Sequence, residues 1–474
     1  MQTDVGIYRQ SKRGYSERPP YFPAEIFPEY PFADTRVDKD NEAYGSLRRL
    51  FLLLGLDSGN FGKKSWNPFG PFLYPGNTAL LKPNFMRHFN ERGGASGLIT
   101  HGSLIRAAAD YAYIALKGKG RIIIADGPMD DADFDKIAKL TGLYEIQKFY
   151  KENVKFDIEI YDLRQERVTK QGEKIIRRDK LRGDPFGYSV VNMGEASAFK
   201  KGHPDHRCFR GSECRTDIMS LHHNEARNEY LISSTFLSAD VIINLPKMKT
   251  HKRAGVTLSL KNMVGVTGDR NWLPHSMEPS VSKDKKKQGL KAEILHSLRS
   301  FRMSSRKKFI RLLILIKPLR DALRQSIGVT DAVVSAGNWY GNDIMWRTIV
   351  DLGHISKYAD KKGAITKDKQ RRSFVIVDGI VGGEGDGPTN PVPKPCGVLI
   401  AGFDELRADI AAARVMGFDP MKVPKFKNIN DLPKDIKCAS NVKAWNGNIF
   451  DFRGRCLDFK PHYGWKGHIE ADIR

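Results

Sequence analysis

Lysine and histidine residues are concentrated at residues 247–251, directly after an apolar segment that predicts a buried strand. If the chain stays extended there, alternate side chains share one side, so Lys247, Lys249 and His251 point the same way. Clustered ammonium groups repel one another unless an anion offsets their charge. We therefore expect a phosphate or carboxylate ligand here, with Thr250 binding it and His251 acting in proton transfer or as a metal ligand. An ordinary basic turn exposed to solvent is the alternative.

Further polar residues stand at comparable places along the chain. Lys82 and Asn84 follow a short apolar run, and Lys261 and Asn262 follow the lysine-rich segment closely. We expect these four residues to bind the same anionic ligand. His101 stands just before a predicted helix, where backbone N–H groups favour an anion. We assign His101 to acid–base catalysis, and a role in capping or packing the helix is the alternative.

A glycine-rich segment, residues 378–388, follows another apolar strand and contains Asp378, Glu384 and Asp386. Glycine allows positive φ and a close approach of the backbone to a ligand. No Gly-Lys-Ser or Gly-Lys-Thr follows, and Pro388 interrupts the chain, so the segment is neither a Walker loop nor a dinucleotide-binding fingerprint. We expect its carboxylates to bind a divalent metal ion, to accept hydrogen bonds from substrate hydroxyls, or to pair with the lysines. A simple glycine-rich turn is the alternative.

The five cysteines are scattered and do not have the close spacing of iron–sulfur ligands. We therefore expect no iron–sulfur cluster. His203, His206, Cys208 and Cys214 follow one another in an order that suggests a metal site. The surrounding lysines and arginines would repel a cation, so we do not assign a metal there.

Apolar runs that end in polar residues recur along the chain and predict buried strands. The expected strands are 78–82, 122–125, 156–161, 241–243, 374–377 and 398–401. Helical spacing predicts helices over 103–116 and after residue 404. The pattern indicates an α/β fold with a mostly parallel sheet, helices on both faces and Rossmann-like halves. Ligands of such sheets bind at the carboxyl ends of the strands, where the lysines stand.

Composition shifts divide the chain into five parts. We predict a wrapping arm with one short helix near residues 43–54, two α/β parts separated by a basic helical insertion, and a C-terminal extension. The corresponding ranges are 1–75, 76–279, 280–330, 331–430 and 431–474. Within the insertion, residues 280–328 combine lysines and arginines with an apolar stretch, which is typical of a helix on an anionic membrane. A helix docked on the rest of the protein is the alternative.

The formal net charge of +23 over 474 residues is compatible with nucleic acid, an anionic membrane surface or small anions as partners. We expect no nucleic-acid binding, because zinc-finger, helix-turn-helix and aromatic stacking patterns are absent from the sequence. No apolar run approaches the length of a membrane span, and the N-terminus does not resemble a signal peptide. We therefore expect a cytoplasmic protein, with peripheral membrane attachment through 280–328 as the alternative.

Several of these motifs, taken in order, carry a resemblance to a known family. They are Leu81-Lys82-Pro83-Asn84, Ile124-Ala125-Asp126-Gly127-Pro128, the run from Val241 to His251, Thr257-Leu258-Ser259-Leu260-Lys261-Asn262, and Glu384-Gly385-Asp386-Gly387-Pro388. From about residue 78 to about residue 420, the sequence resembles the uncharacterised family called domain of unknown function 362. Relatives often carry a ferredoxin-like iron–sulfur module, which implies redox chemistry in the family. This chain lacks those cysteines and is similar to the longer members without the module.

These observations favour an enzyme that acts on a phosphorylated or carboxylated small molecule in a cleft of Lys, His and Asp residues. One alternative is a redox or metal-dependent protein that takes electrons from an external donor, as the family resemblance implies. The other alternative is a non-catalytic protein that docks on a membrane or an acidic partner through residues 280–328.

Overall fold

The computed structural model describes residues 5–172, 174–202, 204–211, 216–277, 334, 336–428, 442–444 and 456–472. The predicted basic insertion therefore lies outside the described residues, as does most of the predicted C-terminal extension. The membrane-docking alternative concerns residues of which the structure says nothing. Within the described chain, no helix combines the length and apolar character needed to cross a membrane.

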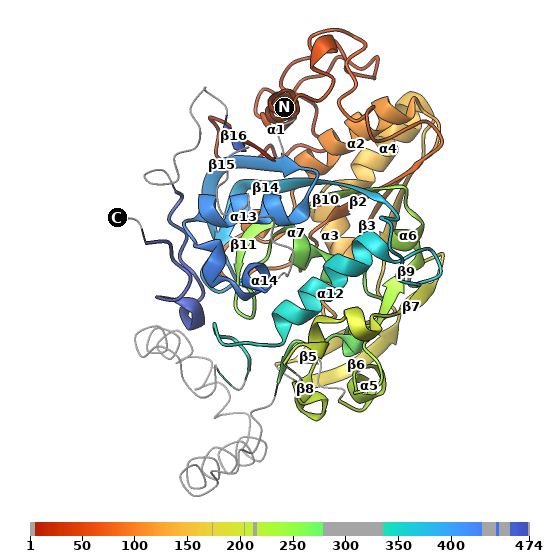
Figure 1. Cartoon of the computed structure of the whole chain (residues 1–474). Helices are drawn as coiled ribbons and strands as arrows, with labels where there is room; N and C mark the ends of the chain where they lie inside the picture. Colours follow the sequence, from red (N-terminus) through yellow and green to blue (C-terminus); the bar gives the residue numbers. More distant parts are fainter. Residues whose placement is uncertain are drawn as a thin grey trace, which may run out of the picture.

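Ten strands of the described chain form one sheet at the centre of the molecule (Figure 1). Its order is β16 (Val442–Ala444), β1 (Val5–Arg9), β15 (Val392–Gly402), β14 (Arg372–Glu384), β10 (Val241–Leu245), β2 (Thr78–Pro83), β3 (Arg121–Asp126) and β4 (Ile158–Asp162). β11 (Lys247–His251) pairs with β14, and also with the short β12 (Gly255–Val256). The strands from β14 to β4 are parallel, whereas β15 is antiparallel to both of its neighbours. The predicted α/β fold with a mostly parallel sheet is confirmed; Rossmann-like halves stay a prediction.

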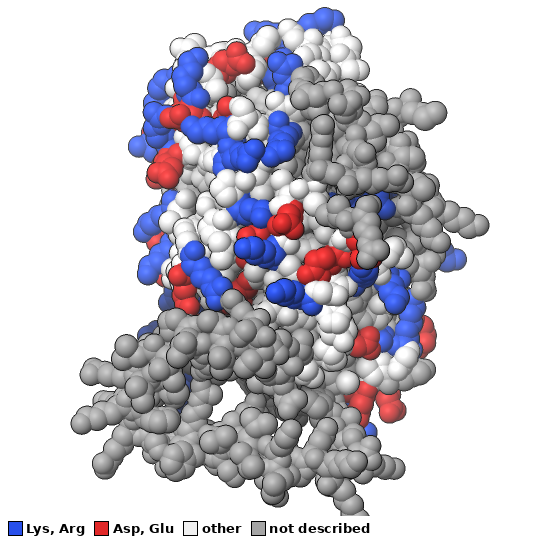
Figure 2. All heavy atoms as spheres, turned by 90° about the vertical axis from the view of Figure 1, so that its left-hand side faces the viewer, with Lys and Arg blue, Asp and Glu red and all other residues white. Residues whose placement is uncertain are grey.

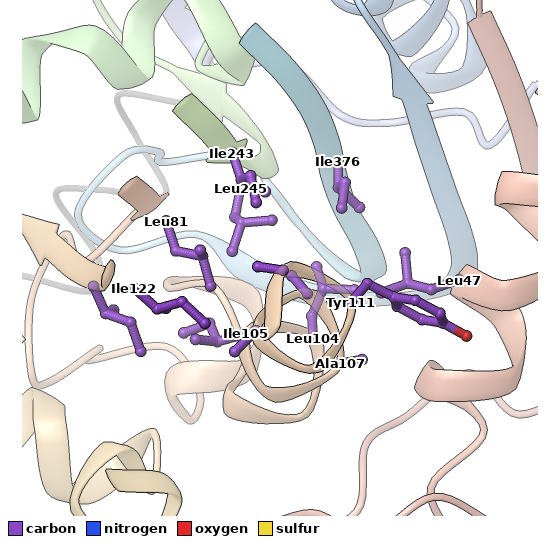
Figure 3. Close-up of a cluster of buried hydrophobic side chains, with 14 of the residues drawn as sticks. Leu47, Leu81, Leu104, Ile105, Ala107, Tyr111, Ile122, Ile243, Leu245 and Ile376 are labelled. Atoms are coloured by element: carbon purple, nitrogen blue, oxygen red, sulfur yellow. The ribbon is translucent and has the colours of Figure 1, made fainter. Parts of the chain in front are cut away.

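Alternating side chains of the buried strands fill two hydrophobic clusters, one on each face of the sheet. On one face, Leu81 and Ile243 join residues of α2 (Gly102–Leu116) and α1 (Ala43–Leu53) in a single cluster. Figure 3 shows strand residues of this cluster facing Leu104, Ile105 and Tyr111 of α2. Burial of such side chains is the main stabilising contribution to the fold.

The opposite face of the sheet is covered by a second group of helices. Leu80 and Ile242 share their cluster with residues of α7 (Leu258–Asn262), α12 (Met345–Tyr358) and α13 (Glu405–Met416). The short α14 (Pro424–Lys427) belongs to the same group. Helices thus lie on both faces, as the sequence predicts, and Figure 1 shows the two groups on opposite sides of the sheet.

The remaining described elements surround this core. They are α3 (Phe134–Leu140), α4 (Leu143–Val154), α5 (Thr216–His222) and α6 (Ser234–Ser238), together with the strand pairs β5 (Glu166–Gln171) with β6 (Lys174–Lys180), β7 (Tyr188–Asn192) with β9 (Glu229–Ser233), and β8 (Phe209–Arg210) with β13 (Ser276–Met277). The N-terminal part contains the predicted helix as α1. It also contributes β1 to the sheet, which the irregular sequence pattern did not indicate.

The glycine-rich segment is not the loop that the sequence suggested. Residues from Asp378 to Glu384 continue β14 and pair with β15, although the register shifts after Gly379. A Cβ at Gly379 would lie 2.6 Å from the Cε of Met248, and one at Gly383 would lie 2.4 Å from the carbonyl oxygen of Gly97. Glycine is therefore required here for close packing of neighbouring chains within a strand.

A buried carboxylate on α13 holds the first turn of α7 in place. Asp409 accepts hydrogen bonds from the backbone N–H groups of Ser259, at 2.6 Å, and Leu260, at 3.1 Å. Its other contacts include the Lys425 ammonium of α14, at 3.2 Å. α7 carries Lys261, so this carboxylate fixes the position of a predicted ligand-binding residue.

We expect Asp409→Ala to lower the free energy of unfolding by about 3–5 kcal/mol, because it leaves a buried ammonium without its partner. Denaturant unfolding of the purified variant measures this change. The matched control is Asp135→Ala, which removes an exposed carboxylate whose partner Lys139 is also exposed, and which should leave stability nearly unchanged. Equal effects of both substitutions would contradict the structural role of Asp409.

Candidate functional site

A cavity of about 190 Å³ lies beyond the carboxyl ends of β2 and β3. Its wall includes Asn84, just after β2, and Asp126, the last residue of β3. His251 at the end of β11 and Asn262 at the end of α7 complete the part of the wall nearest the sheet. The cavity thus occupies the position at which open α/β sheets bind their ligands.

The lining of the cavity is strongly basic. Its cationic side chains are Lys170, Lys252, Arg253, Lys261 and Arg270, and the rings of His251 and His275 also line it. Among the described lining residues, Asp126 is the only carboxylate. Its Oδ1 lies 2.5 Å from the Lys82 ammonium, and its Oδ2 accepts a hydrogen bond from the backbone N–H of Phe85 at 2.6 Å. Lys82 therefore neutralises Asp126, so this carboxylate does not offset the charges of the cations that line the cavity.

Lys261 is a lining cation whose charge is not offset by a described carboxylate. In the described chain, its ammonium has neither a hydrogen-bond acceptor nor a carboxylate partner. Burial lowers the pKa of Lys261 well below its usual value, and the nearby cations Arg270 and Lys425 lower it further. A bound anion would supply the missing counter-charge.

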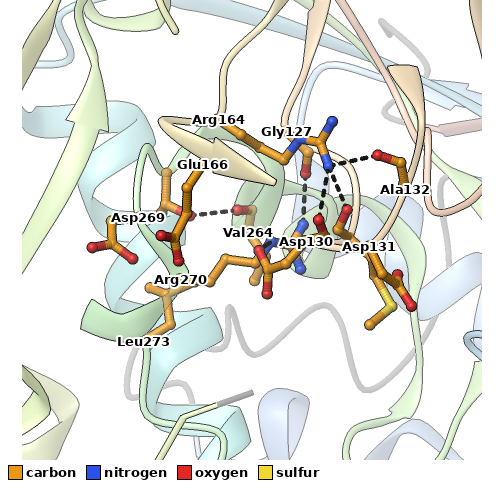
Figure 4. Close-up of polar contacts among 12 residues, drawn as sticks. Gly127, Asp130, Asp131, Ala132, Arg164, Glu166, Val264, Asp269, Arg270 and Leu273 are labelled. Carbon is orange, nitrogen blue, oxygen red and sulfur yellow. Dashed lines mark hydrogen bonds and ion pairs between the residues drawn. The ribbon is translucent and has the colours of Figure 1, made fainter. Parts of the chain in front are cut away.

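Arg270 is fixed in the wall by contacts with the turn that follows β3. Its guanidinium donates to the carbonyl oxygen of Gly127 at 2.6 Å, and its Nε lies 3.5 Å from Asp130 Oδ1 (Figure 4). The same turn is held from the other side by Arg164, which donates to the carbonyl oxygen of Ala132 at 3.0 Å. This network gives the basic wall a defined shape before any ligand binds.

The two histidines of the cavity are oriented by backbone groups. The Nδ1 of His251 accepts hydrogen bonds from the N–H groups of Arg253, at 3.0 Å, and Ala254, at 3.1 Å. The Nδ1 of His275 lies 2.7 Å from the carbonyl oxygen of Leu273. Burial lowers the pKa of both rings well below the usual value. Neighbouring cations add to this effect, so both rings are neutral near pH 7.

The amides of Asn84 and Asn262 link strand ends to α7. Asn84 Nδ2 donates to Asn262 Oδ1 at 3.0 Å, and Asn262 Nδ2 donates to the Lys82 carbonyl oxygen at 3.0 Å and to Asn244 Oδ1 at 2.8 Å. This chain of contacts fixes the orientation of both amides at the edge of the cavity.

Other lysines of the predicted site have partners inside the protein. Lys247 lies 3.0 Å from Asp378 Oδ2 and donates to the Tyr15 hydroxyl at 2.7 Å, while that hydroxyl donates to Asp378 Oδ1 at 2.5 Å. Lys249 is fully buried and donates to the Leu98 carbonyl oxygen at 2.6 Å. Neither lysine lines the cavity. The extended backbone predicted for residues 247–251 is observed, but it points these ammonium groups into the protein.

His101 and Thr250 also have structural contacts. The His101 ring caps α2 by accepting from the backbone N–H of Ser103, and it stacks on Tyr15 with ring centres 4.0 Å apart. The backbone N–H of His101 donates to Asp378 Oδ2 at 3.0 Å. The Thr250 hydroxyl donates to the Gly385 carbonyl oxygen at 3.0 Å. Capping, the alternative considered for His101, is what the structure shows, and a catalytic role stays a prediction.

Each of the three acidic residues proposed as metal ligands contacts a basic side chain. Glu384 lies 2.9 Å from the Lys394 ammonium, and Asp386 lies 3.6 Å from His462 Nε2. Asp378 belongs to the Lys247 network described above. Within the described ranges, no group of three or more His, Cys, Asp or Glu side chains is placed to hold a metal ion. A divalent metal stays a prediction, and His203 and Cys214 lie outside the described residues.

Sequence reasoning therefore found part of the cavity. Of the predicted residues, the cavity lining contains Asn84, His251, Lys261 and Asn262. It also contains residues that the sequence analysis did not single out, namely Lys170, Lys252, Arg253, Arg270 and His275. Lys252 and Arg253 directly follow His251 and could have been found by extending the basic run. His275 and Arg270 have no comparable signal, because only the folded chain brings them to the strand ends.

We expect part of the stability present at pH 7 to be lost as the pH falls from about 6.5 towards 3. Burial lowers the pKa of His101 from 6.5 to about 3, so in this range the unfolded chain binds a proton that the folded chain does not. His101→Asn keeps a side-chain oxygen able to cap α2 and removes the titrating ring. Unfolding free energies measured across this range should fall less steeply in the variant. An unchanged slope would show that other groups account for the loss.

Comparison with known proteins gives a family match for the part of the chain that contains most of the residues lining this cavity. A family model described as domain of unknown function (DUF362) matches residues 191–414. No curated protein and no solved structure gave a match. The matched range includes His251, Lys261 and Arg270, whereas Lys82 and His101 precede it. Over residues 191–414, the chain therefore matches the domain of unknown function 362 family.

Proposed function

We propose that this protein is an enzyme that binds a phosphorylated or carboxylated small molecule in the basic cavity at the strand ends. The observation that carries the proposal is the position of Lys261, whose ammonium lines the cavity among other cations without a described partner. An uncompensated charge of this kind is costly, so proteins keep it mainly where a ligand supplies the opposite charge.

The charge balance of the lining supports an anion over a cation or a neutral ligand. Burial and neighbouring cations also lower the pKa of Lys252, next to His251. Each of these groups would regain its usual protonation more easily beside a phosphate or carboxylate. Several donors converging on one small volume also provide the hydrogen bonds that such oxygens need.

The size of the cavity favours a small ligand. A volume of about 190 Å³ is of the order of the ~150 Å³ cavities that accept a benzene-sized guest. It is below the roughly 300–1,000 Å³ typical of drug-sized ligands. A molecule with one anionic group and a short carbon skeleton fits this volume, and a dinucleotide does not.

The face drawn in Figure 2 gives no support for a nucleic-acid partner. On the coloured part of the face in Figure 2, Lys and Arg side chains are interspersed with Asp and Glu. Nucleic-acid binding proteins typically present a continuous basic stripe or patch to the phosphate backbone. The expectation that nucleic acid is not the partner is therefore retained.

Lys261→Met tests the proposal, because it removes the ammonium and keeps an unbranched apolar side chain of similar reach. We expect the affinity for inorganic phosphate, measured by isothermal titration calorimetry, to fall about tenfold or more, since a charge-assisted hydrogen bond contributes roughly 1.5–3 kcal/mol. In the absence of phosphate, the variant should be more stable than the parent chain, because a partly buried cation without a counter-charge is lost. Lys148→Met on α4, where the side chain is exposed, is the control for the change in net charge.

Lys247→Met should change stability in the opposite direction. It distinguishes a lysine that is paired inside the protein from Lys261, which lines the cavity. It leaves the fully buried Asp378 without its cation, and we expect the free energy of unfolding to fall by about 3–5 kcal/mol. If Lys261→Met also destabilised the chain and bound phosphate as tightly as the parent, Lys261 would be a structural residue and the proposal would fail.

A further inference from the structure

We infer that the two histidines of the cavity have opposite roles, in which His251 donates its Nε2–H to the bound anion and His275 accepts a proton at its Nε2. This inference rests on the proposed anion site and adds the direction of proton transfer within it. It follows from the backbone groups that contact the two Nδ1 atoms.

The ring of His251 can be protonated only at Nε2 while its present contacts last. A backbone N–H is always a donor, and two such groups, from Arg253 and Ala254, point at Nδ1. Nδ1 must therefore carry a lone pair, so the proton of the neutral ring is on Nε2. Nε2 has no partner among the described residues, and the ring lines the cavity. His251 thus presents a hydrogen-bond donor to a ligand.

The ring of His275 has the other tautomer. Its Nδ1 lies 2.7 Å from the Leu273 carbonyl oxygen, which can only accept a hydrogen bond. Nδ1 therefore carries the proton of the neutral ring, and Nε2 carries the lone pair. Within the described chain, no donor occupies that lone pair, and the ring lines the same cavity as His251. His275 can therefore take a proton from a bound hydroxyl or water without breaking its own backbone contact.

The charges around His275 explain how ligand binding and proton uptake are coupled. Arg253 after β11, Lys261 on α7 and Arg270 disfavour the imidazolium form in the empty cavity. Lys170 of β5 and Lys252 after β11 are the other two cations of the wall, and Asp126 of β3 is already paired with Lys82. A bound anion offsets these charges and makes protonation of His275 easier. Binding of an anion should therefore be accompanied by uptake of a proton at this ring.

Asparagine variants distinguish the role of Nδ1 from that of Nε2 in each ring. In His251→Asn the amide oxygen can accept from the Arg253 N–H, and in His275→Asn the amide NH₂ can donate to the Leu273 carbonyl. In each variant, the amide therefore replaces Nδ1 in its hydrogen bond to the backbone, whereas nothing replaces Nε2. His462→Asn is the matched control, because His462 Nδ1 likewise accepts from a backbone N–H, that of Gly464, at 3.1 Å, and its ring is outside the cavity.

The first test is the tautomer itself. Long-range ¹H–¹⁵N spectra of the full chain labelled with ¹⁵N-histidine distinguish the protonated from the unprotonated nitrogen of each ring. The signals that disappear in each asparagine variant assign the spectra. We expect His251 to be protonated at Nε2 and His275 at Nδ1. The same tautomer in both rings, or the reverse assignment, would overturn the inference.

The second test uses inorganic sulfate, which does not itself titrate near neutral pH. Calorimetric titrations in buffers of different ionisation enthalpy, at a pH near about 6.5, count the protons taken up on binding. We expect His275→Asn to reduce this number relative to the parent chain, whereas His251→Asn keeps it and lowers the affinity about tenfold. Any protonation of Lys261 occurs in all variants, so the difference isolates His275.

The outcomes separate the two proposals. If neither sulfate nor phosphate binds the parent chain, the proposed function fails. If sulfate binds and His275→Asn takes up as many protons as the parent chain and His462→Asn, the anion site stands and the role of His275 is wrong.

Discussion

Three buried ion pairs of the described chain connect strands and helices that carry or support residues of the cavity wall. Lys82 pairs with Asp126, Lys247 with Asp378, and Lys425 with Asp409. A buried ammonium without a partner costs several kcal/mol, so each of these lysines requires its carboxylate. The pairs connect β2 with β3, β11 with β14, and α14 with α13. They hold together the elements that form the cavity wall.

These pairs leave the cavity itself cationic. Of the carboxylates nearby, Asp126 is neutralised by Lys82, and Asp409 is shared between Lys425 and the first turn of α7. Lys261 follows in α7 and lines the cavity, where burial and then the neighbouring cations lower its pKa. The same packing that stabilises the fold therefore leaves an excess of positive charge in the cavity. The anionic ligand that we propose would offset this charge, and the two neutral histidines would supply it with a proton donor and a proton acceptor.

The hydrophobic pattern was enough to predict a mostly parallel sheet and several of its strands and covering helices. β2 was expected at residues 78–82 and is observed at Thr78–Pro83, and the helix expected over 103–116 is α2. Continuous apolar runs specify strands that are buried on both faces, because helices cover them. β1 and the continuation of β14 beyond Asp378 were missed. Glycine-rich strand segments lack the side chains on which such predictions depend.

The sequence by itself determined the fold class and showed that lysines, histidines and carboxylates stand at the ends of buried strands. It could not determine which lysine pairs with which carboxylate, because such pairs join residues far apart in the chain, as Lys247 and Asp378 do. Only the tertiary structure separated Lys247, whose charge is satisfied inside the protein, from Lys261, whose ammonium faces the cavity. It also brought His275 to the same wall as His251. The physical reason is that periodicity records which face of an element is buried, whereas the charge of a site depends on long-range contacts.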